Sequence, residues 1–313
     1  MTDSSSTVLV KGATGAQGGA TARRLLAAGR RVRFLTRDPH SAAARALAAA
    51  GAQAAQGNLG DAASIAAALQ GVEAVFSVQM PDLSGNDYER RHGFALVQAA
   101  RAAGVIRFVH TSVAQAGRHA GFPGWDAGRW LNNYWTDKWD VEEAVRQAGF
   151  SQWTVLQPAF MMDNLARPKS RHMFPHLAQG ELLTALRHET RLHFIAADDV
   201  GAFAAAALTE PSPLHGQTIP LASQALTMSE VAATLARTLR AGVRAVHVSP
   251  QEALTAGLFS GWVNSQEWMN EVGYAVDIDK ARSYGIALTP LDAWAAAHGS
   301  AISLPAPVAG TVA

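Results

Sequence analysis

The amino-acid sequence predicts an α/β fold: a doubly wound parallel sheet with a smaller, mostly helical C-terminal lobe. In the first half of the 313 residues, short β-branched or aromatic runs alternate with longer alanine-rich amphipathic runs. Parallel strands need crossover connections, so this alternation predicts helices on both faces of the sheet. After Pro158 the alternation gives way to a loop-rich stretch. We therefore expect the sheet domain over residues 1–157 and an interleaved lobe over residues 158–313.

The individual elements follow from periodicity and from the residues that end each run. Glycine, aspartate or proline bounds the expected strands, which are Thr7–Val10, Val32–Leu35, Ala52–Ala55, Ala74–Val78, Ile106–His110 and Trp153–Gln157. Apolar residues at helical spacing mark the expected helices Gln17–Ala28, Ser41–Ala50, Ala62–Leu69, Tyr88–Ala103 and Tyr134–Gln147. The C-terminal half adds helices Asp199–Leu208 and Met228–Arg240 and strands Gln217–Leu221 and Ala245–Val248.

Composition and charge exclude several classes of protein. The chain has 26 Lys and Arg residues against 25 Asp and Glu, and this balance argues against nucleic acid as a partner. The absence of cysteine excludes disulfides, thiolate metal sites and cysteine nucleophiles, and it agrees with a reducing cytosol. The start lacks the features of a secretory signal, and no apolar stretch reaches the ~20 residues of a membrane span. We expect a cytoplasmic protein without a membrane partner, either a monomer or a homodimer.

No metal site is expected either. His172 and His176 are four residues apart, but Pro175 interrupts the helix that would align them. No Asp or Glu near them has the spacing of a metal site.

The strongest local signal is a glycine-rich segment directly after the first expected strand. It reads G-x-x-G-x-x-G and opens the first expected helix. Glycine permits a tight turn and close approach of the backbone to a pyrophosphate, and the helix N-terminus offers free amides and partial positive charge. This strand–turn–helix setting favours a bound dinucleotide over a simple turn. The expected contacts are Gly12, Ala13, Thr14, Gly15, Ala16, Gln17 and Gly18.

The residues after the second expected strand select between the two dinucleotides. A carboxylate at this place usually bonds the ribose 2′-hydroxyl of NAD. Here Arg37 offers charge-assisted hydrogen bonds to a 2′-phosphate. Asp38 is the counter-argument, but the following Pro39 suggests that Asp38 caps the next helix. The sequence therefore favours NADP over NAD.

These segments closely resemble the NmrA-like family of atypical short-chain dehydrogenases/reductases, over roughly residues 7 to 300. The matching segments are 12–26, 34–39, 56–59, 77–79, 108–112, Lys138 with 141–143, and 158–160 with Asn164. The resemblance implies a Rossmann domain, bound NADP(H) and a C-terminal lobe that forms a cleft over the nicotinamide. It adds Asn58, Leu59, Gln79, Lys138 and Phe160 to the expected cofactor contacts. Asn58 departs from the aspartate common in the family, which weakens the expected contact near the adenine.

A candidate catalytic pair lies in the helix after the fifth strand. Tyr134 and Lys138 form the Tyr-x-x-x-Lys pattern of active short-chain dehydrogenases, which places both side chains on one helix face. The tyrosine would exchange a proton with the carbonyl oxygen, while the lysine would bind the ribose and lower the tyrosine pKa. Many NmrA-like proteins lack a working tyrosine, so Tyr134 as a pocket wall stays open. Ser112 could polarise the substrate carbonyl or cap the strand end.

Large apolar side chains crowd the same region: Trp125, Trp130, Tyr134, Trp135, Trp139, Phe160, Met161, Met162 and Phe174. They could line a site for a flat aromatic ligand or cement the two lobes. We expect an NADPH-dependent reductase of a carbonyl or quinone, with a small aromatic substrate. The alternatives are a non-catalytic NADP(H)-binding redox sensor and a cofactor-independent oxygenase on the same fold.

Overall fold

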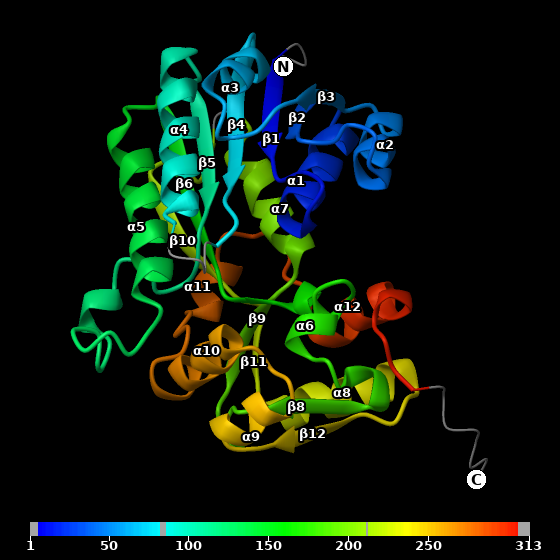
Figure 1. Ribbon diagram of the computed structural model, residues 1–313. Coiled ribbons are helices and arrows are strands. Elements are labelled where there is room, and N and C mark those ends of the chain that lie inside the picture. Colours follow the sequence, from blue (N-terminus) through cyan, green and yellow to red (C-terminus); the bar gives the residue numbers. More distant parts are fainter. Residues whose placement is uncertain (1–5, 82–85, 211, 306–313) are drawn as a thin grey trace. The chain divides into compact units, whose positions relative to one another are not determined.

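The computed structural model describes residues 6–81, 86–210 and 212–305 (Figure 1). The chain forms two compact units, and each is described by itself. Unit 1 comprises Met1–His119, Asn132–Pro158 and Ala197–Leu221, and unit 2 comprises Ala120–Leu131, Ala159–Ala196 and Ala222–Ala313. Two segments therefore lie on the other side of the division expected at residue 157: Ala120–Leu131 is part of unit 2 and Ala197–Leu221 returns to unit 1.

Unit 1 contains a seven-stranded sheet in the order β10-β6-β5-β4-β1-β2-β3. Every neighbouring pair of strands is parallel. The strands are β1 (Thr7–Lys11), β2 (Arg31–Thr36), β3 (Gln53–Gln56), β4 (Val72–Val78), β5 (Arg107–Thr111), β6 (Gln152–Pro158) and β10 (Gln217–Leu221). The order reverses at β1, so the predicted doubly wound parallel sheet is confirmed, and a ligand is expected at the carboxyl ends of the central strands.

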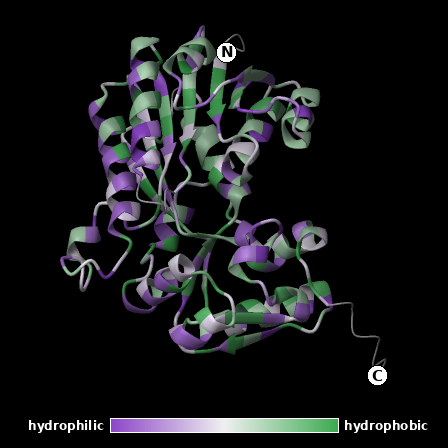
Figure 2. Cartoon of the chain, viewed as in Figure 1, coloured by the Kyte–Doolittle hydropathy of each residue, from purple (hydrophilic) through white to green (hydrophobic). Residues whose placement is uncertain are grey.

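Two helical layers cover this sheet. The helices α3 (Ala62–Leu69), α4 (Tyr88–Ala102) and α5 (Asn132–Gln147) share one core with inward residues of the strands, including Leu9, Val75 and Phe108. The helices α1 (Ala16–Ala27) and α7 (Ala197–Ala207) pack closely on each other. Their contact is possible because Gly201 has no side chain: a Cβ there would clash with Ala20. The short helix α2 (Ala42–Ala49) follows β2. Figure 2 shows hydrophobic strands between helices that carry hydrophilic residues.

His110 is a buried titratable group in the middle of this sheet. Its ring is 2% exposed on β5, and its Nδ1 lies 3.2 Å from the Ser77 hydroxyl. Burial, followed by the positive charges of Lys138 and Arg146, lowers the pKa of His110 to about 3. The neutral ring is therefore the form that the folded chain accepts.

We expect acid to destabilise the chain through His110. The folded pKa lies below the unfolded value, so this stability is complete above pH 6.5 and is lost as the pH falls toward 3. The shift corresponds to at most roughly 4 to 5 kcal/mol. Urea unfolding between pH 4 and 7 should show a smaller loss of stability for His110→Gln than for the parent. If the free energy of unfolding falls equally steeply with pH in the two proteins, His110 is excluded as the acid-sensitive group.

Unit 2 contains two small sheets and several short helices. The strands β7 (Phe160–Met161), β9 (Leu192–Ile195) and β11 (Gln224–Leu226) form one sheet, and β8 (Glu181–Thr184) pairs with β12 (Arg244–His247). Its helices are α6 (Ser170–Met173), α8 (Met228–Leu239), α9 (Pro250–Thr255), α10 (Ser260–Glu271), α11 (Ile278–Arg282) and α12 (Leu291–His298). In the described part of the chain, no helix has the length and apolar character that a membrane crossing requires.

Candidate dinucleotide site

The loop between β1 and α1 is a tight cradle that only glycine can form at two positions. Gly12 has a φ of 75°, and a Cβ there would lie 2.6 Å from a Val78 methyl carbon. A Cβ on Gly18 would lie 2.3 Å from the Gly12 carbonyl oxygen. The Gly15 amide donates to that same oxygen at 2.9 Å and closes the turn. The glycine pattern is thus explained by backbone geometry.

The outer side of this loop is open to a ligand. Thr14 and Gly15 are exposed, whereas Ala13 is buried beneath them. No side chain caps the N-terminus of α1, and its first turn, with Ala16 at its start, has no acidic residue. The side chain of Gln17 is oriented by Thr111, whose hydroxyl donates to Gln17 Oε1 at 2.7 Å. Uncapped amides at a glycine turn fit a pyrophosphate.

The loop after β2 presents Arg37 as an available cation. Arg37 is exposed and makes no hydrogen bond or ion pair with any residue that the structure describes. Asp38, by contrast, accepts a hydrogen bond from the His40 amide at 2.8 Å. The N-cap of α2 is Ser41, which accepts from the Ala44 amide. The interpretation of Asp38 as the helix cap was therefore wrong, although its carboxylate is still engaged locally.

The loops after β3 and β4 contribute the other expected contacts of unit 1 to this edge of the sheet. Asn58 Oδ1 accepts from the Gly60 amide at 2.8 Å, so this side chain shapes its own turn. Leu59 is part of the core, which leaves its backbone as the part available to a ligand. Gln79 donates to the Ser77 hydroxyl at 3.0 Å, while its buried Oε1 has no partner in the part of the chain described. Such an acceptor could take a hydrogen bond from a ligand.

Lys138 is held by a carboxylate that the sequence analysis missed. Its Nζ lies 2.6 Å from Glu89 Oε1, and both side chains are almost fully buried. The two come together because α4 and α5 pack closely: a Cβ on Gly93 would lie 2.3 Å from a Val141 methyl carbon. Glu89 lies one turn before Gly93, and Lys138 lies one turn before Val141. The second Glu89 oxygen is buried without a partner among the described residues.

Tyr134 lies one turn from Lys138 on α5, as the spacing predicts. The ammonium is 4.8 Å from the centre of the tyrosine ring, and Trp135 packs edge-on against the same ring. The Tyr134 hydroxyl has no hydrogen bond to a described residue. Burial, and then the Glu89 carboxylate, raises the pKa of Tyr134 above its usual value. The expectation that Lys138 lowers this pKa is thus wrong for the protein alone, because burial dominates and Lys138 is paired with Glu89.

Ser112 lies beside a different part of α5. It follows β5, its amide donates to the Leu156 carbonyl at 2.9 Å, and its buried hydroxyl has no hydrogen-bond partner among the described residues. The hydroxyl lies near the Glu142 carboxyl, where it opposes the rise in pKa that burial causes. Glu142 and Tyr134 are eight residues apart on the helix, or about 12 Å along its axis. No hydrogen bond joins the Ser112 and Tyr134 hydroxyls. The structure therefore does not bring the three predicted catalytic residues into one hydrogen-bonded group.

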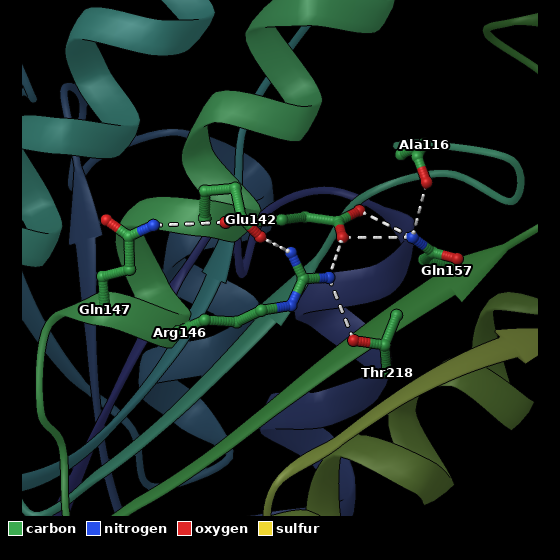
Figure 3. A network of polar contacts seen from close by, with 7 residues as sticks. Ala116, Glu142, Arg146, Gln147, Gln157 and Thr218 are labelled. Atoms are coloured by element: carbon green, nitrogen blue, oxygen red, sulfur yellow. Dashed lines mark hydrogen bonds and ion pairs between the residues drawn. The ribbon is translucent and has the colours of Figure 1, made fainter. Parts of the chain in front are cut away.

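A buried polar network fixes α5 to the sheet (Figure 3). Gln157 on β6 donates to both oxygens of Glu142, at 2.9 and 3.1 Å, and to the Ala116 carbonyl. Arg146 pairs with Glu142 and also donates to the Thr218 hydroxyl on β10 at 3.0 Å. These bonds tie the second half of the helix to two strands. They position the first half, which carries Tyr134 and Lys138.

The crowded aromatic residues mostly pack within their own units. In unit 2, Phe160 stacks on Trp262 at 5.4 Å and contacts the rings of Phe174 and Phe194. Trp130 is 3% exposed and donates from its indole nitrogen to the Pro123 carbonyl. Met161, Met162 and Trp135 are buried as well. Phe160 as a cofactor contact and the remaining aromatic residues as a ligand lining stay predictions.

The cradle, the open helix N-terminus and the parallel sheet define a dinucleotide-binding protein of the Rossmann class. The chain belongs to the NmrA-like family, whose model matches residues 4–292. An NAD(P)H azoreductase of Xenophilus azovorans is 33% identical over 271 residues, which are 85% of each chain.

Two solved structures share the fold at lower identity. An NADPH-dependent quinone oxidoreductase of Escherichia coli, complexed with NADPH, has a TM-score of 0.72 and 23% identity, covering 94% of this chain and 99% of that one. NmrA, a negative transcriptional regulator in complex with NADP, has a TM-score of 0.73 and 21% identity, covering 93% and 94%.

Proposed function

We propose that this chain is an NADPH-dependent reductase that acts on a carbonyl or quinone group of an aromatic substrate. It is an NADP(H)-dependent oxidoreductase of the NmrA-like family. The observation that carries the finer proposal is the placement of Tyr134 and the ion-paired Lys138 on one face of α5. A related enzyme that reduces azo compounds supports an aromatic substrate.

The residues of unit 1 divide the work of holding the cofactor. The amides of Gly12–Gly18 would bind the pyrophosphate, Arg37 the 2′-phosphate and Lys138 the nicotinamide ribose. Asn58, Leu59 and Gln79 would surround the adenosine. NADPH supplies a hydride when bound. The residues of the chain would orient the cofactor and supply the proton.

Tyr134 is suited to donate that proton from its hydroxyl to the substrate oxygen. Because burial and Glu89 raise its pKa, the hydroxyl stays protonated through the physiological pH range. A negative charge that develops on the substrate oxygen would receive its hydrogen bond. Ser112 lies near Glu142, about two turns along α5 from Tyr134, so this proposal does not place its hydroxyl at the reacting oxygen.

A second candidate function is an NADP(H) sensor without turnover. The raised pKa of Tyr134 favours it, because a weaker acid is a poorer proton donor. The fold shared with the regulator NmrA supports it as well. Both candidates require the same cofactor site, so turnover separates them.

The test is NADPH consumption across quinones, azo dyes, ketones and aldehydes, with cofactor binding measured on the same preparation. The reductase proposal expects steady consumption with at least one aromatic compound. Stoichiometric NADPH binding without consumption for the whole panel would favour the sensor.

Arg37 is expected to set the preference for NADPH over NADH. Arg37→Asp removes a charge-assisted contact and should weaken NADPH binding by about 1.5–3 kcal/mol, narrowing or reversing the preference. Titration calorimetry with both cofactors measures this, and Arg118→Asp, an exposed change elsewhere in unit 1, is the control. Equal affinity of the parent for NADPH and NADH would reject the role of Arg37.

A further inference from the structure

Lys11 is the last residue of β1 and directly precedes the glycine cradle. Its neighbour in the parallel register is Leu35 on β2. Arg37 directly follows β2, and its guanidinium is near enough to Lys11 to contribute to the lowered pKa of that lysine. The chain thus directs two cations toward the carboxyl ends of β1 and β2.

The ammonium of Lys11 is not paired with a carboxylate of its own among the described residues. Lys11 is half-buried, and it makes no hydrogen bond or ion pair with any residue that the structure describes. The charged groups that act on it are Glu89 from α4 and Arg37 from the loop after β2. Glu89 is already paired with Lys138 at 2.6 Å. Lys11 and Lys138 therefore face the same carboxylate, and Arg37 adds a further positive charge near Lys11.

An excess of positive charge in a partly buried place is unfavourable unless an anion binds there. Burial lowers the pKa of Lys11 to about 8; Glu89 partly opposes this effect and Arg37 adds to it. The negative charge of a phosphate group near Lys11 and Arg37 would offset both the burial of Lys11 and its repulsion by Arg37. Arg37 is the residue already assigned to the 2′-phosphate.

We propose that Lys11 is a specificity-determining residue that binds the 2′-phosphate of NADPH together with Arg37. The inference rests on the proposed use of NADPH and adds a second cation to its recognition. The competing source of phosphate is the pyrophosphate, which NADPH and NADH share. The two cofactors therefore distinguish the sources.

The experiment is calorimetric titration of the whole chain with NADPH, NADH and adenosine 2′,5′-bisphosphate, comparing the parent with Lys11→Met. We expect Lys11→Met to weaken the binding of NADPH and of the bisphosphate about tenfold or more. The affinity for NADH should change less than about twofold. Lys280→Met, an exposed lysine change in unit 2, is the control and should change none of these affinities.

Proton uptake gives a second readout that a structural role would not produce. At pH 8 about half of the Lys11 side chains are neutral in the free protein, and the phosphate is already a dianion. Binding of NADPH should then take up as much as about half a proton, measured in two buffers of different ionisation enthalpy. Binding of NADH should be accompanied by less proton uptake. Lys11→Met should remove the extra proton uptake seen with NADPH.

The outcomes separate this inference from the function on which it rests. Unchanged NADPH affinity and proton uptake in Lys11→Met, with the NADPH preference intact, would overturn the role of Lys11 alone. If Lys11→Met weakens the binding of NADPH and NADH equally, Lys11 contacts the pyrophosphate that both cofactors share, and the proposal is overturned. A parent chain that binds neither cofactor would overturn the proposed function as well.

Discussion

Tyr134→Phe is expected to lower turnover by about 10²–10⁴-fold and to leave the NADPH affinity nearly unchanged. The substitution keeps the ring that packs on Trp135 and under the Lys138 ammonium, and it removes only the hydroxyl. That hydroxyl forms no hydrogen bond with the described residues, so its loss should cost little folding stability. Steady-state turnover and calorimetric binding of NADPH measure the two effects separately.

The pH profile adds a check on the same residue. Because the pKa of Tyr134 is raised, its ionisation should produce no loss of kcat below pH 10. A loss near pH 8 should instead be visible in the KM for NADPH, as Lys11 loses its charge. Tyr88→Phe, on an exposed tyrosine of α4, is the matched control. Parental turnover in Tyr134→Phe would remove this residue from the mechanism.

Lys138→Met is expected to weaken both NADPH binding and folding. Removing the lysine leaves Glu89 as a buried carboxylate without its partner, and breaking a buried pair costs about 3–5 kcal/mol. NADPH binding also loses a charge-assisted hydrogen bond to the ribose, worth about 1.5–3 kcal/mol. Urea unfolding and calorimetric titration report the two losses.

The double variant Lys138→Met with Glu89→Gln separates these two effects. It removes the stranded charge, so unfolding stability should recover most of its loss. NADPH affinity should stay weak, because the ammonium is still missing. Recovery of NADPH affinity together with stability would show that Lys138 acts only through the fold.

The fold could be predicted largely because its signals are local. The glycine cradle, the strand positions to within two residues and the helix α3 follow from periodicity and turn chemistry within short segments. The return of Ala197–Leu221 to unit 1 could not be predicted. It includes β10, an edge strand of the sheet, and the residues of such a strand do not indicate which strand they pair with. Long-range pairing decides that placement.

The candidate site was predicted only in part for the same reason. The spacing of Tyr134 and Lys138 lies within one helix, so the sequence shows it directly. Glu89 is 49 residues from Lys138, and its position in the first turn of a helix looks like ordinary helix chemistry. Burial, and after it the Glu89 carboxylate, raises the pKa of Tyr134, which is opposite to the expected direction. Gly93, whose missing side chain lets α4 approach α5, was the one signal in the sequence for this contact.

The most direct test of the central claim is an isotope effect on NADPH oxidation in a single turnover. The measurement uses NADPH deuterated on one or the other face of the nicotinamide, with an aromatic substrate identified in the panel. A reductase predicts slower oxidation with deuterium on one face and unchanged oxidation with deuterium on the other. Reduction of the aromatic compound with NADPH oxidation equally fast for deuterium on either face, and equal to that of unlabelled NADPH, would contradict the account.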